Sequence, residues 1–213
     1  MRAPSATNNP FHTTAAGYDQ HLSRPFISRI RRQEAQAVRE LISAHAGPGD
    51  TALEVGPGTG FYTMMLAERV RRVTAIEDSR TMAEILSRRL EAEGVENVSV
   101  RHADFLTFAD DEAFDVVMAI GVLDYIPEPV AFVTRMCELA RKAVILTVPQ
   151  RGLWGACFAV SNRLRGISVF CYRDASVAKW APGWRCAVTE AGLKTPLTRG
   201  LTLVAALERE SRV

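Results

Sequence analysis

The sequence lacks cysteine pairs, long hydrophobic runs and a strong net charge, and each absence excludes a class of protein. The four cysteines stand singly, with no CxxC pair and no His/Cys cluster, so we expect no metal site and thiols kept reduced in the cytoplasm. No stretch approaches the roughly 18 apolar residues of a membrane-spanning helix. The N-terminus has no apolar core of the kind found in signal peptides. A formal net charge of +2 is too small to indicate nucleic-acid binding.

The residues that are present suit a single α/β domain. The chain has 213 residues, of which 47% are hydrophobic, enough to bury a core without metals or disulfides. Residues 17–46 carry apolar side chains at helical spacing, and the GPGD segment 47–50 ends that pattern. We therefore predict an N-terminal tail with cap helices over residues 1–46 and the main domain over residues 47–213.

Short apolar segments alternate with segments of helical spacing from residue 51 onward. Strands that are apolar on both faces predict a parallel sheet covered by helices on both sides. After Pro149 the alternation breaks, and residues 150–173 form an irregular, aromatic-rich insert. A turn at Arg199-Gly200 predicts a hairpin that makes the last strand antiparallel. The expected strands are 51–55, 73–76, 98–100, 114–120, 143–148, 193–198 and 201–207; the expected helices are 61–70, 80–93 capped by Ser79, 127–140 and 175–191.

A glycine-rich loop with the sequence EVGPGTG follows the first expected strand and contains Gly56, Gly58 and Gly60. Ligands of open α/β sheets bind where strands end, and glycine there lets a ligand approach the backbone. A dinucleotide-binding loop needs its third glycine one residue later, where Phe61 stands. No lysine follows the loop, which excludes a P-loop. The alternative is a tight turn without a ligand, although such a turn needs only one glycine.

Acidic side chains near the loop narrow the choice of ligand. A buried Glu54 would repel a pyrophosphate but suits a cationic ligand such as S-adenosylmethionine, which carries an ammonium and a sulfonium. Glu77 ends the second expected strand, where its carboxylate can accept both ribose hydroxyls, with Asp78 as a second acid. Asp104 can accept from an adenine amino group while Phe105 flanks the ring. The alternative for Glu77 and Asp78 is that they are helix-capping acids. The alternative for Asp104 is a solvated loop acid.

These residues together resemble the class I S-adenosylmethionine-dependent methyltransferases of the small-molecule type. Residues 53–60 are similar to the first motif of that family, Glu77 to its ribose-binding acid and residues 103–105 to its adenine-contacting segment. Residues 114–126 resemble the motif of the fourth strand, whose end at Gly121 lines the cofactor and substrate side. The resemblance implies a Rossmann-like seven-stranded sheet of order 3-2-1-4-5-7-6 with an antiparallel last strand, and S-adenosyl-L-methionine as cofactor.

Two further points of comparison with the family concern the ends of the site. Tyr18 resembles a tyrosine of many small-molecule members, in which an N-terminal helix folds over the cofactor; a helix start without a ligand explains it equally well. The family's Asn/Asp-Pro-Pro-Tyr motif, used on exocyclic amines of DNA and on glutamine side chains, does not follow the fourth strand here. The resemblance therefore argues against a nucleic-acid substrate.

Methyl transfer needs alignment of the nucleophile, methyl group and sulfur, and a base only when the nucleophile holds its proton. The candidate bases are Asp124, Tyr125 and His21. The simpler explanation of Asp124 is an acid at a helix N-terminus, and that of His21 is a surface histidine. The insert 150–173 either lines an apolar pocket, lies against lipid or packs on the edge of the core. We expect a methyltransferase for a small hydrophobic molecule; the alternatives are a non-catalytic cofactor-binding protein and an RNA or protein methyltransferase. The oligomeric state stays open.

Overall fold

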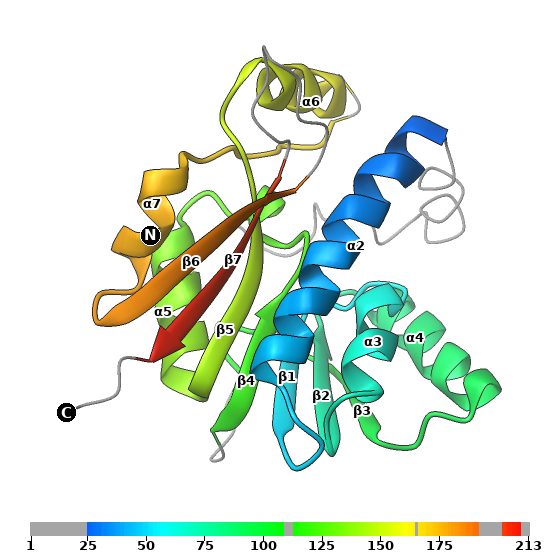
Figure 1. Cartoon of the computed structure of the whole chain (residues 1–213). Helices are drawn as coiled ribbons and strands as arrows, with labels where there is room; N and C mark the ends of the chain where they lie inside the picture. Colours follow the sequence, from blue (N-terminus) through cyan, green and yellow to red (C-terminus); the bar gives the residue numbers. More distant parts are fainter. Residues whose placement is uncertain (1–24, 109–112, 165, 192–201, 210–213) are drawn as a thin grey trace.

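The structure, a computed structural model, describes residues 25–108, 113–164, 166–191 and 202–209 (Figure 1). One sheet of seven strands runs through the molecule in the order β3-β2-β1-β4-β5-β7-β6. Strands β1 to β5 pair in parallel, whereas β7 is antiparallel to both β5 and β6. The strands are β1 Thr51–Val55, β2 Arg72–Glu77, β3 Val98–His102, β4 Phe114–Ala119, β5 Ala140–Pro149, β6 Trp184–Ala191 and β7 Thr202–Arg209. The Rossmann-like fold and strand order expected from the sequence are confirmed.

Helices cover both faces of this sheet, as the two-sided apolar strands predict. On one face α2 and α3 pack through Val38, Ile42 and Leu66, among other side chains. On the other face α5 and α7 pack through Phe132 and Val177, among other side chains. The helices are α2 Pro25–His45, α3 Phe61–Ala67, α4 Arg80–Glu93, α5 Pro129–Leu139, α6 Leu153–Arg163 and α7 Asp174–Trp180, with a 3₁₀ turn η3 Leu123–Tyr125. None of the helices within the described ranges is long and apolar enough to cross a bilayer.

The expected helix over 175–191 is wrong in its second half. The helix α7 ends at Trp180, and residues 184–191 form strand β6, paired with β7. Proline lacks the amide that a helix needs, and Gly183 has a left-handed φ of 82°, so the Pro182-Gly183 pair stops the helix.

The strand period then replaces the helical one. Trp184 and Cys186 are partly buried and pack on the core, while Arg185 and Ala187 between and after them stay exposed. Partly buried and exposed side chains thus alternate from residue 184 to residue 187, as they do in a strand that has one face on the core. The strand expected over 193–198 lies outside the described residues.

The helix after β4 begins at Pro129 rather than at Pro127, which corrects a smaller expectation. The chain first makes the 3₁₀ turn η3, in which the amide of Ile126 donates to the carbonyl of Leu123. This extra turn displaces the start of α5 by two residues.

The insert 150–173 is not irregular throughout, since it contains α6. Gly155 lets α6 approach the end of β5, because a Cβ there would lie 2.2 Å from the carbonyl oxygen of Gln150. The insert is therefore closely packed against the strand that precedes it.

Candidate cofactor and substrate site

The glycine loop joins β1 to α3 at the carboxyl edge of the sheet. Gly56, Gly58 and Gly60 have φ values of 66°, 57° and 88°, a region that L side chains rarely adopt. An added Cβ would lie 2.6 Å from Val122 Cγ2 at Gly56 and 2.4 Å from Leu86 Cδ1 at Gly60. At Gly58 it would meet nothing within 4 Å. The outer two glycines therefore allow packing within the protein, and Gly58 leaves open space in front of the backbone.

Glu54 lies on β1 just before this loop and is only 2% exposed. Its Oε2 atom has no hydrogen-bond partner within the described residues. Burial raises the pKa of Glu54 to about 7, the hydroxyl of Thr63 offsets part of the rise, and the charge of Glu77 adds to it. A buried carboxylate without a full set of partners is costly, so a positively charged ligand nearby would stabilise its ionised form.

Glu77 ends β2 and is buried, with 7% exposure. Its Oε2 accepts a hydrogen bond of 3.1 Å from the amide of Gly58, and its Oε1 accepts one of 2.9 Å from the amide of Ser79. Ser79 caps α4 by accepting from the amide of Met82, as expected from the sequence. The neighbouring Asp78 is exposed. The structure thus brings Glu77 into contact with the glycine loop from the adjacent strand.

Asp104 and Phe105 follow β3 but have different surroundings. Asp104 is exposed, and its Oδ1 accepts a hydrogen bond of 2.8 Å from the amide of Leu106. Phe105 is 4% exposed, with its ring centroid 4.8 Å from that of Phe132 in the core. The apolar side chain at the surface of this segment is Leu106, which is 54% exposed. Phe105 therefore supports the segment from below, and its contact with an adenine ring stays a prediction.

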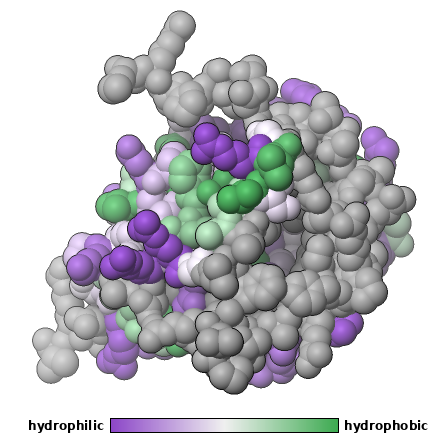
Figure 2. Space-filling model, turned by 90° about the horizontal axis from the view of Figure 1, so that it is seen from above, coloured by the Kyte–Doolittle hydropathy of each residue, from purple (hydrophilic) through white to green (hydrophobic). Residues whose placement is uncertain are grey.

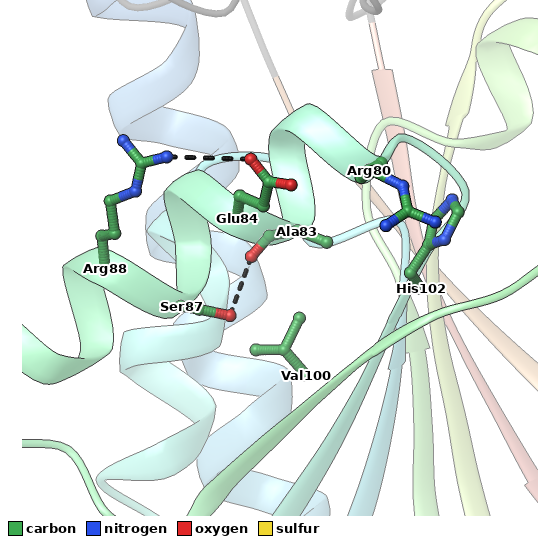
Figure 3. A pocket seen from close by; sticks show the side chains of 7 residues that line it. All are labelled: Arg80, Ala83, Glu84, Ser87, Arg88, Val100 and His102. Carbon is green, nitrogen blue, oxygen red and sulfur yellow. Dashed lines mark hydrogen bonds and ion pairs between the residues drawn. The ribbon is translucent and has the colours of Figure 1, made fainter.

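A groove of about 370 Å³ lies beside these acids, between α4 and β3 (Figure 3). The side chains of Arg80 and His102 project over one end of it. His102 also forms a hydrogen bond of 3.1 Å between its Nε2 and the carbonyl oxygen of Asp78. None of the site residues expected from the sequence lines this groove. The lining consists of Arg80, Ala83, Glu84, Ser87, Arg88, Val100 and His102.

The end of β4 holds the residues that the resemblance assigns to the substrate side. Gly121 has a φ of 70°, is exposed, and donates its amide to Thr147 Oγ1 at 2.7 Å. Asp124 lies in η3, where burial raises the pKa of its carboxyl to about 7 and the charge of Glu34 on α2 adds to the rise. Tyr125 is partly buried in the same turn. Of the sequence candidates for a base, Asp124 thus lies near a carboxylate from the N-terminal helix, and Tyr125 follows it in the same turn.

The insert contacts this turn directly. The amide of Phe170 donates to the carbonyl oxygen of Asp124 at 2.8 Å, and the hydroxyl of Tyr172 donates to the carbonyl oxygen of Ile126. Burial and the charge of Asp124 raise the pKa of the Tyr172 phenol to about 12 and also raise the pKa of Cys171. The segment after α6 therefore forms one wall around Asp124, and α2 forms another.

Sequence reasoning missed residues that hold the glycine loop and the helix above it. Glu34 on α2 accepts a hydrogen bond of 2.7 Å from the hydroxyl of Tyr62 on α3. Arg89 on α4 donates to the carbonyl oxygen of Thr59 at 3.1 Å, which holds the loop from outside. Both side chains occupy polar positions of helices, where the sequence pattern indicates only a solvated face.

Thr147 is a third missed residue, and here a signal was available. Its hydroxyl holds the amide of Gly121, and it is the polar member of the apolar run Val-Ile-Leu-Thr-Val in β5. A buried hydroxyl needs a partner, so its place in that strand predicts a hydrogen bond at the end of a neighbour. Tyr18 and His21, the two candidates from the N-terminal segment, lie outside the described residues.

Comparison with known proteins agrees with this arrangement. Residues 52–143 match the family model described as a methyltransferase domain. Among curated proteins, protein-L-isoaspartate O-methyltransferase 2 of Syntrophobacter fumaroxidans is 33% identical over 129 residues, which are 60% of this chain and 47% of that protein. The chain spans about half the length of the curated relatives it matches.

Two solved structures share the fold over nearly the whole chain. Magnesium protoporphyrin IX methyltransferase (ChlM) from Synechocystis PCC 6803, with bound SAH, has a TM-score of 0.75 at 18% identity, covering 94% of this chain and 96% of that one. N-methyltransferase NodS from Bradyrhizobium japonicum WM9, in complex with S-adenosyl-L-homocysteine, has a TM-score of 0.67 at 17% identity, covering 90% and 91%.

The sheet order, the glycine loop and the acids on β1 and β2 are the features in which this chain resembles the class I methyltransferases. The matched domain and the shared fold confirm the resemblance that the motifs predict. Residues 52–143 of this chain match a methyltransferase domain, and its seven-stranded sheet has the order that the resemblance to the class I type implies.

Proposed function

We propose that this protein is an S-adenosylmethionine-dependent methyltransferase that acts on a small hydrophobic molecule. The observation that carries the proposal is the pair formed by Glu54 and Gly58. A buried carboxylate oxygen without a partner in the described residues lies just before a loop whose central glycine faces open space. This combination suits a cationic ligand held against bare backbone and disfavours a diphosphate.

The residues present fit that cofactor. Glu54 would compensate its positive charge. Glu77 accepts the amides of Gly58 and Ser79, which fixes its carboxylate at the end of β2, where it would bind the ribose hydroxyls. The backbone that would hold the amino-acid portion is that of Gly56, Gly58, Gly60 and Gly121.

The adenine end would lie beside β3. Asp78 is an additional acceptor close to the ribose, and the second oxygen of Asp104 is an acceptor for the adenine amino group, with Phe105 beneath the segment. Tyr18 would cover the cofactor from the N-terminal segment.

The chemistry that this cofactor supplies when bound is a methyl group on a sulfonium, which leaves as a neutral thioether. The protein must align the acceptor and, for a protonated nucleophile, remove its proton. Asp124 suits the second task, because a pKa near 7 makes its carboxylate a matched base at neutral pH. Tyr125 and His21 are the alternative groups for this role.

The insert supports the substrate class. The sequence of the insert 150–173 is rich in apolar residues, and the amide of its Phe170 donates to the turn that holds Asp124. Among the structural neighbours, ChlM is named for magnesium protoporphyrin IX. A second candidate is methylation of a protein carboxylate, which the names of the curated relatives favour. Methyl transfer to an isoaspartyl peptide but to no lipophilic acceptor would select this candidate.

The test of cofactor binding is calorimetry with S-adenosylhomocysteine. We expect saturable binding by the natural chain and its loss in Gly58→Asp, which adds bulk and negative charge in front of the loop. Absence of binding at millimolar ligand would overturn the proposal. Binding without methyl transfer to any member of a broad acceptor panel would instead identify a non-catalytic cofactor-binding protein.

A further inference from the structure

The insert 150–173 differs from the rest of the chain in charge. It contains Arg151, Arg163, Arg165 and Arg173 and no Asp or Glu, so its formal charge is +4. Since the whole chain has a net charge of +2, the remaining residues sum to −2. Arg151, Arg163 and Arg173 are exposed, and none of them forms an ion pair with a carboxylate within the described residues.

Helix α6, at the centre of this insert, has one inner and one outer face. Ala159 and Asn162 are partly buried, at the spacing of one helix face. The outer face carries Val160, which is 59% exposed, and Leu164, which is 85% exposed at the end of the helix, with Arg163 between them. No other large hydrophobic side chain for which the structure describes an exposure is as exposed as these two.

The end of α6 fixes where these side chains lie. Gly166, with a φ of 78°, donates its amide to the carbonyl of Arg163, and Ile167 donates to that of Asn162, both at 3.0 Å. This double hydrogen bond is a common glycine stop of a helix, and it holds Leu164 in the last turn. Leu164 is therefore exposed on a well-defined helix end.

The outer face of α6 lies beyond the carboxyl end of β5, at the same edge of the sheet as the glycine loop. Figure 2 looks down on this end of the molecule and shows hydrophobic side chains gathered there with hydrophilic ones beside them. Exposed aliphatic side chains beside an exposed arginine, in a segment whose sequence contains no acids, match the surface of an anionic bilayer. The bilayer accepts the apolar side chains, and its headgroups attract the arginines.

We propose that α6 is a peripheral docking surface for an anionic lipid membrane, made by Val160, Arg163 and Leu164 and flanked by Arg151 and Arg173. The docked face is part of the insert whose Phe170 contacts the turn of Asp124. Docking places the substrate side of the protein at the bilayer, where hydrophobic acceptors dissolve. Lipid binding itself does not depend on methyl transfer and goes beyond the function proposed above.

The experiment is co-sedimentation of the full chain with vesicles of phosphatidylcholine mixed with phosphatidylglycerol, and with vesicles of phosphatidylcholine alone. We expect binding to the mixed vesicles that weakens with added salt, and much weaker binding to the neutral ones. Arg163→Glu should lower the affinity for mixed vesicles by at least about fivefold, and Leu164→Ser by about the same factor.

The matched control is Arg141→Glu, which makes the same change of charge at an exposed residue near the amino end of β5, the opposite edge of the sheet. It should bind mixed vesicles as the natural chain does. Equal losses in Arg163→Glu and Arg141→Glu would reduce the effect to net charge and overturn the docking surface. A dimer in light scattering that Leu164→Ser dissociates, without vesicle binding, would overturn it as well. Thermal unfolding of each variant separates lost binding from lost folding.

Discussion

The carboxylate of Glu77, at the end of β2, accepts a hydrogen bond of 3.1 Å from the amide of Gly58, in the loop that follows β1. This bond joins two adjacent parallel strands at the glycine whose open side faces the candidate cofactor site. The loop conformation is therefore set by the protein before any ligand binds, which lowers the cost of ordering it on binding.

Replacement of Gly58 tests whether its open side is ligand space. Gly58→Ala should weaken binding of S-adenosylhomocysteine by at least about tenfold, because the added methyl group fills the space in front of the loop. The left-handed backbone adds a stability loss of about 1 kcal/mol. Calorimetry measures the affinity, and thermal unfolding measures the stability.

The matched control is Gly94→Ala, at the end of α4. Gly94 also has a left-handed backbone, with a φ of 67°, and a Cβ there would meet nothing within 4 Å. We expect a similar stability loss in this variant and an unchanged affinity. Equal affinities for the two variants would show that the space at Gly58 is not used by the ligand.

Glu54→Gln should stabilise the ligand-free protein above pH 7. Burial raises the pKa of this carboxyl to about 7 in the folded chain, above its ordinary value of 4.5 in an unfolded chain, so stability falls as pH rises between these values. As pH rises, the carboxyl of Glu54 loses its proton in the unfolded chain before it does so in the folded chain, which favours unfolding. Glutamine does not ionise, so the variant lacks this loss of stability. The gain in free energy of unfolding should grow up to pH 7 and then stay constant, at no more than about 3 kcal/mol.

The same variant should bind S-adenosylmethionine more weakly at pH 8, because an amide cannot compensate the charge of a cationic ligand. Glu91→Gln, at an exposed carboxyl on α4, should change neither property. A stability difference that does not vary with pH would mean that Glu54 does not titrate in this range.

The local features of the site follow from the sequence, because they depend on neighbours in the chain. The apolar run 51–55 predicts a buried strand, and the burial of Glu54 follows from its place in that run. The glycine loop can also be predicted from the sequence, because its three glycines are close neighbours in the chain. The position of Glu77 follows from the end of the second strand, although its bond to Gly58 depends on the pairing of the two strands.

The contacts that the sequence does not predict join segments far apart in the chain. Glu34 and Asp124 approach each other only because α2 packs across the sheet, and a glutamate on a helix otherwise indicates a solvated face. The error at β6 has a local cause: apolar residues of 175–191 satisfy helical spacing in part, and the break at Pro182-Gly183 outweighs that pattern.

Asp124→Asn tests the proposed base. We expect kcat/KM to fall by about a hundredfold or more while binding of S-adenosylhomocysteine is retained, because the variant loses proton removal and keeps the cofactor site. The natural chain should show a rate that rises with pH to an inflection near 7, where Asp124 ionises. Glu128→Gln, at an exposed carboxyl four residues along the same loop, should keep the full rate and the inflection. An unchanged rate in Asp124→Asn would remove Asp124 from the reaction.

Glu34→Gln should move the pH inflection of the methyl-transfer rate below that of the natural chain. Burial is the largest cause of the raised pKa of Asp124, and the charge of Glu34 raises it further. Removal of the Glu34 charge therefore lets Asp124 ionise at lower pH. The amide oxygen of glutamine can still accept the hydrogen bond from Tyr62, so α2 keeps its contact with α3. Glu40→Gln removes an exposed charge from the same helix and should leave the inflection in place. An inflection that moves equally in both variants would indicate a general effect of net charge, and one that stays fixed in both would mean that Glu34 does not act on the titrating group.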